Sequence, residues 1–506
     1  MSAARRLWAP QAWIGGGWQA QVLLEIGADG HFSQVQCGVP APDGATVLPG
    51  PVLPGLVNAH SHAFQRAFAG LAERRSGQDD DFWSWRDRMY AVALRVSPAA
   101  LRAVARQLYA ELLQGGYTQV CEFHYLQHQP DGQPYPDRLT MCHALMQAAA
   151  DTGIGLTLLP VLYERAGFQQ PALRDDQRRF ATSVADVLAL RQGVLAAGQA
   201  QVTAGVAIHS LRAAQPASVT QLAHALADAD SPIHIHIAEQ TAEVDDCLAA
   251  TGRRPIDWLA QQVALDGRWH LVHATHATPA EIDTVGRAGA GVVICPSTEA
   301  NLGDGLADLP GWLQHRAVLS IGSDSHMARS WVDELRWLEY GQRLALRQRN
   351  VAAAPALGQG ATAARLFDAV LAGFAGRGDR TAGSLDGAGH LPAGGQRPGP
   401  SQFQLRGVDP RPQPVGFLGA GQLELGLREV APLAQCAHQQ QLGQRTPGVA
   451  GVGECGGALE QQRTGLRETA AGHQGLGQQH VGDGAARLLH PGEFQVVPCQ
   501  GLGAGH

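Results

Sequence analysis

The chain has 506 residues, a net charge of −7, 45% hydrophobic residues and only 16% charged residues. This length suits two to four domains or one large barrel with attachments, and the hydrophobic share is enough for a large core. The acidic balance argues against a basic surface for nucleic acid or anionic membranes. No lysine occurs anywhere, which excludes mechanisms that use a Schiff-base lysine or a carboxylated lysine between two metal ions.

The sequence carries no sign of export or membrane insertion. Its first residues lead into no apolar segment of the kind that a secretion signal contains, and no apolar run approaches the roughly 18 to 20 residues of a membrane helix. The eight cysteines are scattered without CxxC pairs, as expected of reduced thiols. These features predict a cytoplasmic protein that binds neither membranes nor nucleic acid.

Two structural parts are predicted before residue 374. Residues 1–50 contain short alternating stretches broken by Gly and Pro, which predict strands of a small β module. From residue 51 onward, short apolar runs alternate with helix-length segments, the pattern of parallel βα units. Eight strands are predicted, at 52–58, 118–124, 154–162, 202–209, 232–238, 269–274, 291–295 and 318–323.

The helical segments between these strands support the same architecture. One example is 97–115, where Ser97 and Pro98 form an N-cap followed by proline at the first helical position. Eight βα repeats predict an α/β fold, a (β/α)8 TIM barrel over 51–373. A doubly wound sheet is the alternative, but polar clusters at the ends of many strands, rather than at one switch point, favour the barrel.

The composition changes after residue 373. Residues 374–506 are rich in Gly, Gln, Arg and Pro and contain no Trp, Tyr, Met, Ile or Asn. A segment so poor in large apolar side chains cannot easily offset the entropy of ordering. We therefore expect a disordered tail, read out of frame, that leaves the β module without its C-terminal strands. A genuine low-complexity extension is the alternative.

The strongest chemical signal is the pair His60 and His62 at the end of the first barrel strand. Residues two apart in a strand point to the same side, so both imidazoles would face one point, as a metal site requires. An isolated pair could simply be two polar residues, but further clusters end other strands, where a TIM barrel places catalytic groups. They are His234, His236 and Glu239 on strand five, His273 on strand six, and Asp324 on strand eight.

The motif order HxH, HxxE, His and a strand-eight Asp resembles that of the amidohydrolase superfamily. Because the chain contains no lysine, it resembles the single-metal deaminase branch of that superfamily. The choice of His236 over His234, which also faces inward, depends on the HxxE spacing to Glu239. Imidazole-rich, redox-silent sites suit zinc, although iron would fit similar ligands. The resemblance implies one zinc ion per chain, with the ligands His60, His62, His236 and Asp324.

The same resemblance implies roles for the residues around the metal. Zinc lowers the pKa of bound water toward 7 and supplies hydroxide, which would attack an sp2 carbon bearing nitrogen. Asp324 would take the water proton, Glu239 would carry protons to the leaving nitrogen, and His273 would stabilise the oxygen as charge develops. A solvated Glu239 and a packed His273 are the plain alternatives.

Several stretches outside the metal pattern resemble the formimidoylglutamate deiminases in particular, over about residues 8–373. That family hydrolyses N-formimidoyl-L-glutamate to N-formyl-L-glutamate and ammonia in histidine degradation, acting on a C–N bond of a linear amidine. The stretches are HAFQRAFAG at 62–70, FWSWR at 82–86, EFHY at 122–125, HSLR at 209–212 and GSDSH at 322–326.

The resemblance therefore implies a small dicarboxylate substrate. Two carboxylates call for arginines, whose planar fork matches them. Arg86 and Arg212 are the candidates, with Gln65, Tyr125 and His209 as hydrogen-bonding partners. A surface role is the alternative for either arginine.

Two other interpretations stay open. One is a ring deaminase of the same superfamily, acting on a guanine-, cytosine- or adenosine-like base, whose pocket would need no arginine pair. The other is a defective, non-enzymatic product of a frameshifted gene, with the motifs present but little stability. The resemblance also suggests a homodimer, for which the sequence contains no interface signal.

Overall fold

The protein is described from a computed structural model, which covers residues 5–27, 32–73, 75, 80–315, 317–375 and 406–407. These residues belong to the first of two units, Met1–Arg445 and Thr446–His506. Apart from its first two residues and 406–407, the predicted tail lies outside the described residues. The expectation that it is disordered and out of frame therefore stays a prediction. The expectation that the tail supplies no strand to the β module is wrong at one place, because Arg406–Gly407 pairs antiparallel with Leu53 and Val52.

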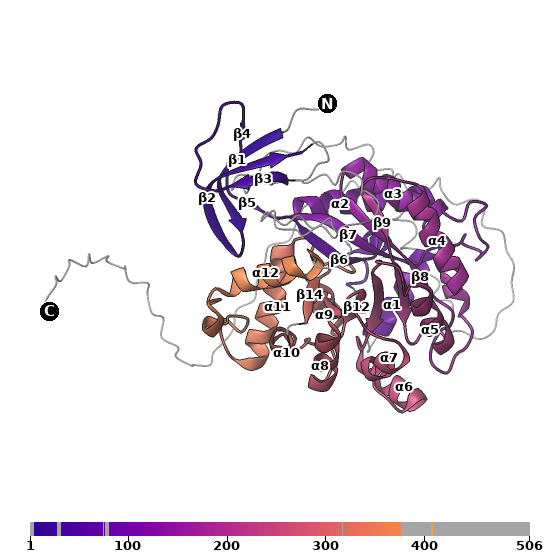
Figure 1. Cartoon of the computed structure of the whole chain (residues 1–506). Coiled ribbons are helices and arrows are strands. Elements are labelled where there is room, and N and C mark those ends of the chain that lie inside the picture. Colours follow the sequence, from indigo (N-terminus) through magenta and orange to yellow (C-terminus); the bar gives the residue numbers. More distant parts are fainter. Residues whose placement is uncertain are drawn as a thin grey trace, which may run out of the picture. The chain divides into compact units, whose positions relative to one another are not determined.

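A small sheet forms the N-terminal part of the chain (Figure 1). Its strands follow the order β15-β5-β1-β2-β3, with β4 paired to β1. Alternating apolar residues of β1 and β2 make one buried face, which includes Leu7, Val22 and Leu24. The strands are β1 (Arg5–Ile14), β2 (Gly17–Ile26), β3 (Phe32–Gln36), β4 (Thr46–Val47), β5 (Val52–Leu53) and, from the tail, β15 (Arg406–Gly407).

The second sheet is parallel and follows the order β6-β7-β8-β10-β11-β12-β13-β14, with β9 paired to β8. A parallel bridge between Ser61 and Asp324 joins its two edges, so the predicted TIM barrel is confirmed. The strands are β6 (Leu56–Ser61), β7 (Tyr117–His124), β8 (Gly155–Leu162), β9 (Val202–Ala204), β10 (Val206–Ser210), β11 (Ile233–Ile237), β12 (Trp269–His273), β13 (Gly291–Ile294) and β14 (Val318–Ile321).

Helices surround these strands (Figure 1). The predicted helix at 97–115 is confirmed as α2, because the Ser97 side chain accepts a hydrogen bond from the Ala100 N–H and Pro98 is the first residue. The α-helices are α1 (Phe82–Ala93), α2 (Pro98–Gln114), α3 (Thr140–Thr152), α4 (Val184–Ala196), α5 (Pro216–Ala225), α6 (Thr241–Thr251), α7 (Pro255–Gln262), α8 (Pro279–Ala288), α9 (Pro296–Leu302), α10 (Leu309–Gln314), α11 (Trp331–Leu346) and α12 (Thr362–Ala375). The 3-10 helices are η1 (Ala63–Phe68), η2 (Asp175–Phe180) and η3 (Pro355–Leu357).

Two predicted strands differ from the structure. The predicted strand 52–58 is divided at Pro54, which has no N–H to donate to a ladder. β5 pairs with β1 of the small sheet, so that sheet continues past residue 50, and β6 runs on to Ser61. The predicted strand 202–209 is divided at Gly205, where a Cβ would lie 2.4 Å from the carbonyl oxygen of Pro232, too close for any other residue.

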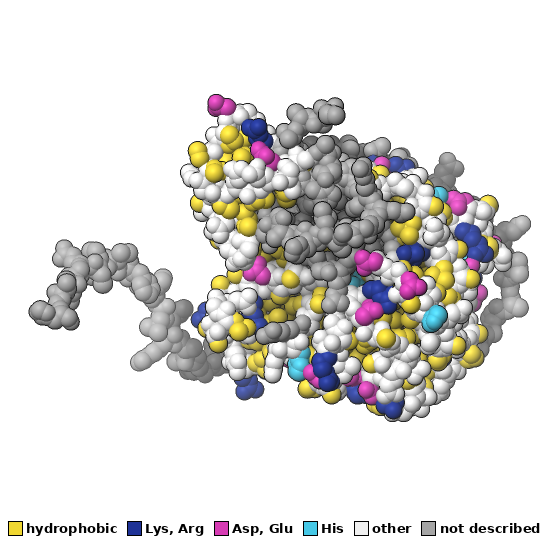
Figure 2. Space-filling view, in the orientation of Figure 1, with side chains coloured by type: hydrophobic (Ala, Val, Ile, Leu, Met, Phe, Trp, Pro, Cys, Tyr) yellow, Lys and Arg dark blue, Asp and Glu magenta, His cyan; other side chains and the backbone are white. Residues whose placement is uncertain are grey.

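The β module contacts the barrel through Trp13. Its indole Nε1 donates to Asp368 Oδ1 at 2.7 Å, and its ring lies edge-on to Phe367. Elsewhere on the described surface, Figure 2 shows acidic and arginine side chains interspersed. Among the described helices, none combines the length and the apolar character that crossing a bilayer requires. The cytoplasmic location stays a prediction.

Candidate metal centre and active site

The predicted metal-site residues lie where the barrel strands end, and all are buried. His60 is in β6, His236 in β11 and His273 is the last residue of β12, whereas Asp324 follows β14. The backbone is left-handed at His273 (φ 69°) and Asp324 (φ 44°). Non-glycine residues seldom adopt this conformation, and such strain persists mainly where the surrounding structure imposes it at functional sites.

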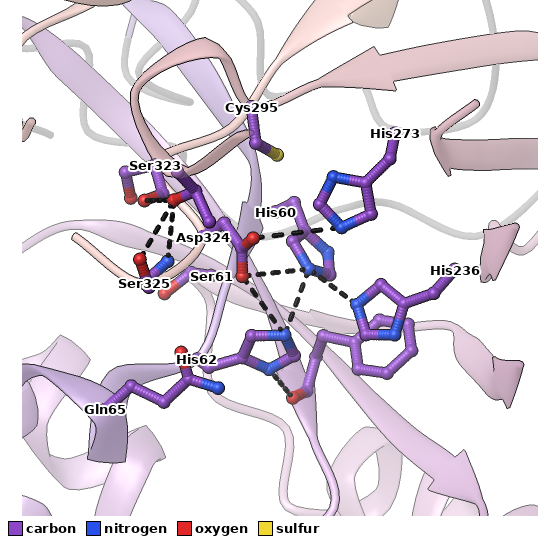
Figure 3. Close-up of polar contacts among 12 residues, drawn as sticks. His60, Ser61, His62, Gln65, His236, His273, Cys295, Ser323, Asp324 and Ser325 are labelled. Carbon is purple, nitrogen blue, oxygen red and sulfur yellow. Dashed lines mark hydrogen bonds and ion pairs between the residues drawn. The ribbon is translucent and has the colours of Figure 1, made fainter. Parts of the chain in front are cut away.

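The four predicted ligands gather around the His60 imidazole (Figure 3). The Nε2 atom of His60 lies 3.1 Å from Nε2 of His62 and 2.9 Å from Nε2 of His236. Oδ1 of Asp324 lies 3.6 Å from the His60 nitrogen and 3.4 Å from the His62 nitrogen. The structure therefore brings together residues from the first and the last strand of the barrel, as His60 and Asp324 show.

This donor set fits a metal ion. His60, His62 and Asp324 form one group whose donor atoms lie close enough to hold a metal ion, and His60, His236 and His273 form another. Burial, with the neighbouring imidazoles, holds the pKa of His60 and of His236 well below its usual value, and burial lowers the pKa of His62 to about 3. Neutral imidazoles are the form that ligates metals. His62 Nδ1 donates to the Phe123 carbonyl at 2.9 Å, which leaves its Nε2 lone pair facing the centre.

The structure also separates the two inward-facing histidines of β11. His236 contacts His60, whereas the His234 ring stacks on His270, with 4.6 Å between the centroids. The two side chains point to the same side of the strand but lie at different depths in the barrel. Only His236 therefore reaches the cluster.

His273 and Glu239 adjoin the cluster. The Nε2 atom of His273 lies 3.6 Å from Glu239 Oε1 and 3.8 Å from Asp324 Oδ2, and its Nδ1 lies 3.2 Å from Glu299 Oε1. Burial alone would lower the pKa of His273, but these three carboxylates outweigh it and raise the pKa to about 10. Burial raises the pKa of Asp324 to about 7, although His273 opposes the shift. His273 therefore lies among three carboxylates, with Glu299 at its Nδ1 and with Glu239 and Asp324 near its Nε2.

Three predicted substrate-binding residues line up beside the metal-site histidines. Gln65 Nε2 donates to the Tyr125 hydroxyl at 3.1 Å. The Tyr125 ring lies 5.4 Å from the His209 ring, and the His209 ring lies 5.1 Å from the His236 ring. Gln65, Tyr125 and His209 therefore form a continuous row of contacts that ends at His236, one of the predicted metal ligands.

The two predicted arginines meet at Trp83, which the sequence analysis did not assign to the site. The Arg86 Cζ lies 4.7 Å and the Arg212 Cζ 5.7 Å from the centre of the Trp83 ring. Arg212 also pairs with Glu239 at 3.7 Å and with Glu243 at 3.9 Å. Among the described residues, neither Nε atom of the two arginines has a hydrogen-bond partner. Two cations beside one ring, each with a donor to spare, are suited to an anionic ligand.

Further residues near the centre escaped the sequence analysis. The Phe123 ring stacks on His236 at 4.3 Å, and Glu299 of α9 reaches His273. Cys295 forms, with His273 and Glu299, one of the groups whose atoms lie close enough to hold a metal. The sequence could have indicated Phe123, because it lies in the stretch EFHY at 122–125 that resembles the formimidoylglutamate deiminases. Glu299 had none, since it follows its strand in a helix and no sequence spacing connects it to His273.

Comparison with known proteins agrees with this geometry. The Amidohydrolase family matches residues 52–370. A formimidoylglutamate deiminase of Pseudomonas aeruginosa is 48% identical over 373 residues, which are 73% of this chain and 81% of that protein. An 8-oxoguanine deaminase of the same organism is 28% identical over 61% of this chain and 67% of its own length. The crystal structure of an amidohydrolase from Brucella melitensis is 42% identical, with a TM-score of 0.69 over 73% of this chain and 82% of that one.

The family match spans the whole barrel. It includes the residues that supply the clustered histidines and the strand-eight aspartate. The chain belongs to the amidohydrolase family.

Proposed function

We propose that this protein hydrolyses N-formimidoyl-L-glutamate to N-formyl-L-glutamate and ammonia, a step of histidine degradation. The observation that carries the proposal is the arginine pair at Trp83, beside the converging donor set. The 48% identity to a formimidoylglutamate deiminase supports the same substrate. We further propose that one zinc ion per chain is held by His60, His62, His236 and Asp324.

Zinc, when bound, would act as a Lewis acid and lower the pKa of water to about 7. Side chains of the protein would then accept and donate the protons of the reaction. Asp324 Oδ1 lies close to both His60 and His62, so this carboxylate is placed to accept a proton from water held at the same point. His273 is oriented by Glu299 and can donate an N–H to the oxygen as negative charge develops.

Glu239 is the proposed proton carrier to the leaving nitrogen. It is buried and lies between two cationic groups, with His273 3.6 Å from one carboxylate oxygen and Arg212 3.7 Å from the other. The backbone N–H of Glu239 is itself held by Glu243 at 3.1 Å. A carboxylate held in this way can receive a proton on the metal side and release it toward the substrate nitrogen.

The arginines orient the other end of the substrate. Arg86 and Arg212 would bind the two carboxylates, and Gln65, Tyr125 and His209 would hydrogen-bond the chain between them and the formimidoyl group. A flat purine or pyrimidine carries no pair of carboxylates and would leave the free Nε donors of Arg86 and Arg212 without an anionic partner. The arginine pair therefore favours the dicarboxylate over the ring deaminase alternative.

The arginine pair gives the test of this proposal. Replacing Arg86 or Arg212 with methionine should lower kcat/KM for N-formimidoyl-L-glutamate about ten- to a hundredfold, because a lost charge-assisted hydrogen bond is typically worth about 1.5 to 3 kcal/mol. Zinc content should not change. Steady-state kinetics with metal analysis of the same preparations measures both.

The control is Arg254→Met, because Arg254 pairs with Glu281 at the start of α8 and plays no part in the proposed site. Unchanged kinetics in both Arg86→Met and Arg212→Met would remove the dicarboxylate argument. Turnover of guanine, cytosine or adenosine by the wild type, without turnover of N-formimidoyl-L-glutamate, would make a ring deaminase the better proposal.

A further inference from the structure

The backbone around His62 lacks a regular strand ladder on the side that faces β7. On the opposite side the His62 N–H donates to the Asp324 carbonyl at 3.3 Å, and the Asp324 N–H donates to the His60 carbonyl at 3.0 Å. The pairing of β6 with β7 loses its register between Asn58 and Ser61. His62 itself lies between the end of β6 and the start of η1, and its side chain makes no capping hydrogen bond there. On the side that faces β7, side-chain contacts must therefore hold this segment, because a regular ladder is what ordinarily holds a strand residue in place.

Glu122 of β7 supplies hydrogen bonds at this junction. Its side chain is 2% exposed and points at the residues on either side of His62. One oxygen accepts from the Ser61 hydroxyl at 2.7 Å and the other from the Ala63 N–H at 2.5 Å. The Tyr109 hydroxyl donates to the carboxylate as well, at 3.3 Å. Three donors thus meet one buried carboxylate.

The next residue of β7 completes the arrangement. The Phe123 carbonyl accepts from His62 Nδ1, and the Phe123 ring stacks on His236 and lies edge-on to His60 at 5.0 Å. One strand therefore contacts three of the four predicted ligands without supplying a ligand itself. The Phe123 carbonyl sets the tautomer of His62, whereas the Glu122 side chain holds the backbone from which that imidazole extends.

We propose that Glu122 is a positioning residue of the metal centre, which holds His62 in ligating geometry by binding Ser61 and Ala63 on both sides of it. Glutamine would weaken this arrangement, because its bond to the Ala63 N–H would no longer be charge-assisted and the Ser61 and Tyr109 hydroxyls would have to accept from its N–H2 group instead of donating. Partners that orient a ligand typically change metal affinity about 10- to 100-fold when they are removed.

The test compares Glu122→Gln with Glu339→Gln in the zinc-loaded full chain. Glu339 is a matched control because it is equally buried and also accepts three hydrogen bonds, from the Val351 N–H at 2.9 Å, the Ala352 N–H at 3.0 Å and Arg343 Nε at 2.8 Å. Zinc affinity is measured by competition with a chelator, and Tm is measured on each metal-free protein. We expect both variants to lose thermal stability, but only Glu122→Gln to bind zinc about 10- to 100-fold more weakly.

Equal zinc affinity in Glu122→Gln and the wild type would overturn the proposal, whatever happens to Tm. If Glu122→Gln does not fold, Ser61→Ala decides, because it removes only one of the three donors. That variant should bind zinc roughly two- to tenfold more weakly, as the loss of one hydrogen bond implies, and wild-type affinity would contradict the proposal.

This inference rests on the metal site of the proposed function, and the same experiment separates the two failures. A wild-type chain that binds no zinc would overturn both. A wild type that binds zinc but does not hydrolyse N-formimidoyl-L-glutamate would overturn the proposed substrate alone, because the effect of Glu122 on zinc affinity does not depend on which substrate the enzyme uses.

Discussion

His60→Ala is expected to lose nearly all bound zinc and to lower kcat/KM roughly a thousandfold or more. The Nε2 atom of His60 is the shared neighbour of His62, His236 and Asp324, so its removal opens the centre of the donor set. Lewis-acid stabilisation is worth several kcal/mol, and each 1.36 kcal/mol corresponds to a factor of about ten in rate. Metal analysis after dialysis, together with steady-state kinetics, measures both effects.

His234→Ala provides the matched control, since it also removes a fully buried histidine but one that stacks on His270 away from the cluster. It should lose stability and keep its zinc. Two metal ions per chain, or full activity after exhaustive chelation, would contradict the single-metal proposal. If His234→Ala rather than His236→Ala lost the metal, the assignment of the β11 ligand would be wrong.

The second large effect is expected for Glu239→Gln, which should lower kcat about 10²- to 10⁴-fold, the usual contribution of a positioned acid–base group. The amide keeps the size of the side chain and stays near His273 and Arg212, so zinc content and overall folding should be preserved. KM should change much less than kcat, because Glu239 acts on the leaving nitrogen rather than on the carboxylates. Initial rates over a range of substrate concentrations separate the two constants.

The control for this variant is Glu281→Gln, which alters a similarly buried carboxylate that pairs with Arg254 at 3.0 Å. It should retain wild-type kcat. A Glu239→Gln enzyme with near wild-type kcat would show that proton transfer to the leaving nitrogen uses another group, and Glu239 would then be assigned to holding His273 and Arg212.

The barrel could be predicted from sequence because its information is local. Each strand is a short apolar run bounded by turn residues, and Ser97 and Pro98 indicate the start of α2. The boundaries were less predictable. The division of 52–58 depends on which sheet each half joins, and β5 pairs with β1, some 40 residues earlier in the chain. Sequence patterns report the conformation of a segment but not its partner.

The candidate site divides in the same way. His60 and His62 lie two residues apart in a strand, so their common direction follows from strand geometry alone. The contact of Trp83 with Arg212 joins α1 to the end of β10, and that of Glu299 with His273 joins α9 to β12. Contacts between elements so far apart in the chain leave no periodicity or spacing to detect.

The sequence by itself determined the barrel and the family resemblance and predicted a set of metal ligands, because strand parity and motif order are encoded in neighbouring residues. The HxxE spacing to Glu239 already favoured His236 over His234, but only the tertiary structure shows that His236 meets His60, because the two histidines share one parity and differ in depth. It also decided which uncharged and acidic residues hold the ligands, as Phe123 and Glu122 do from β7. The depth of each histidine in the barrel and the residues that contact it depend on how the strands are staggered around the closed barrel. That stagger is a property of the whole sheet.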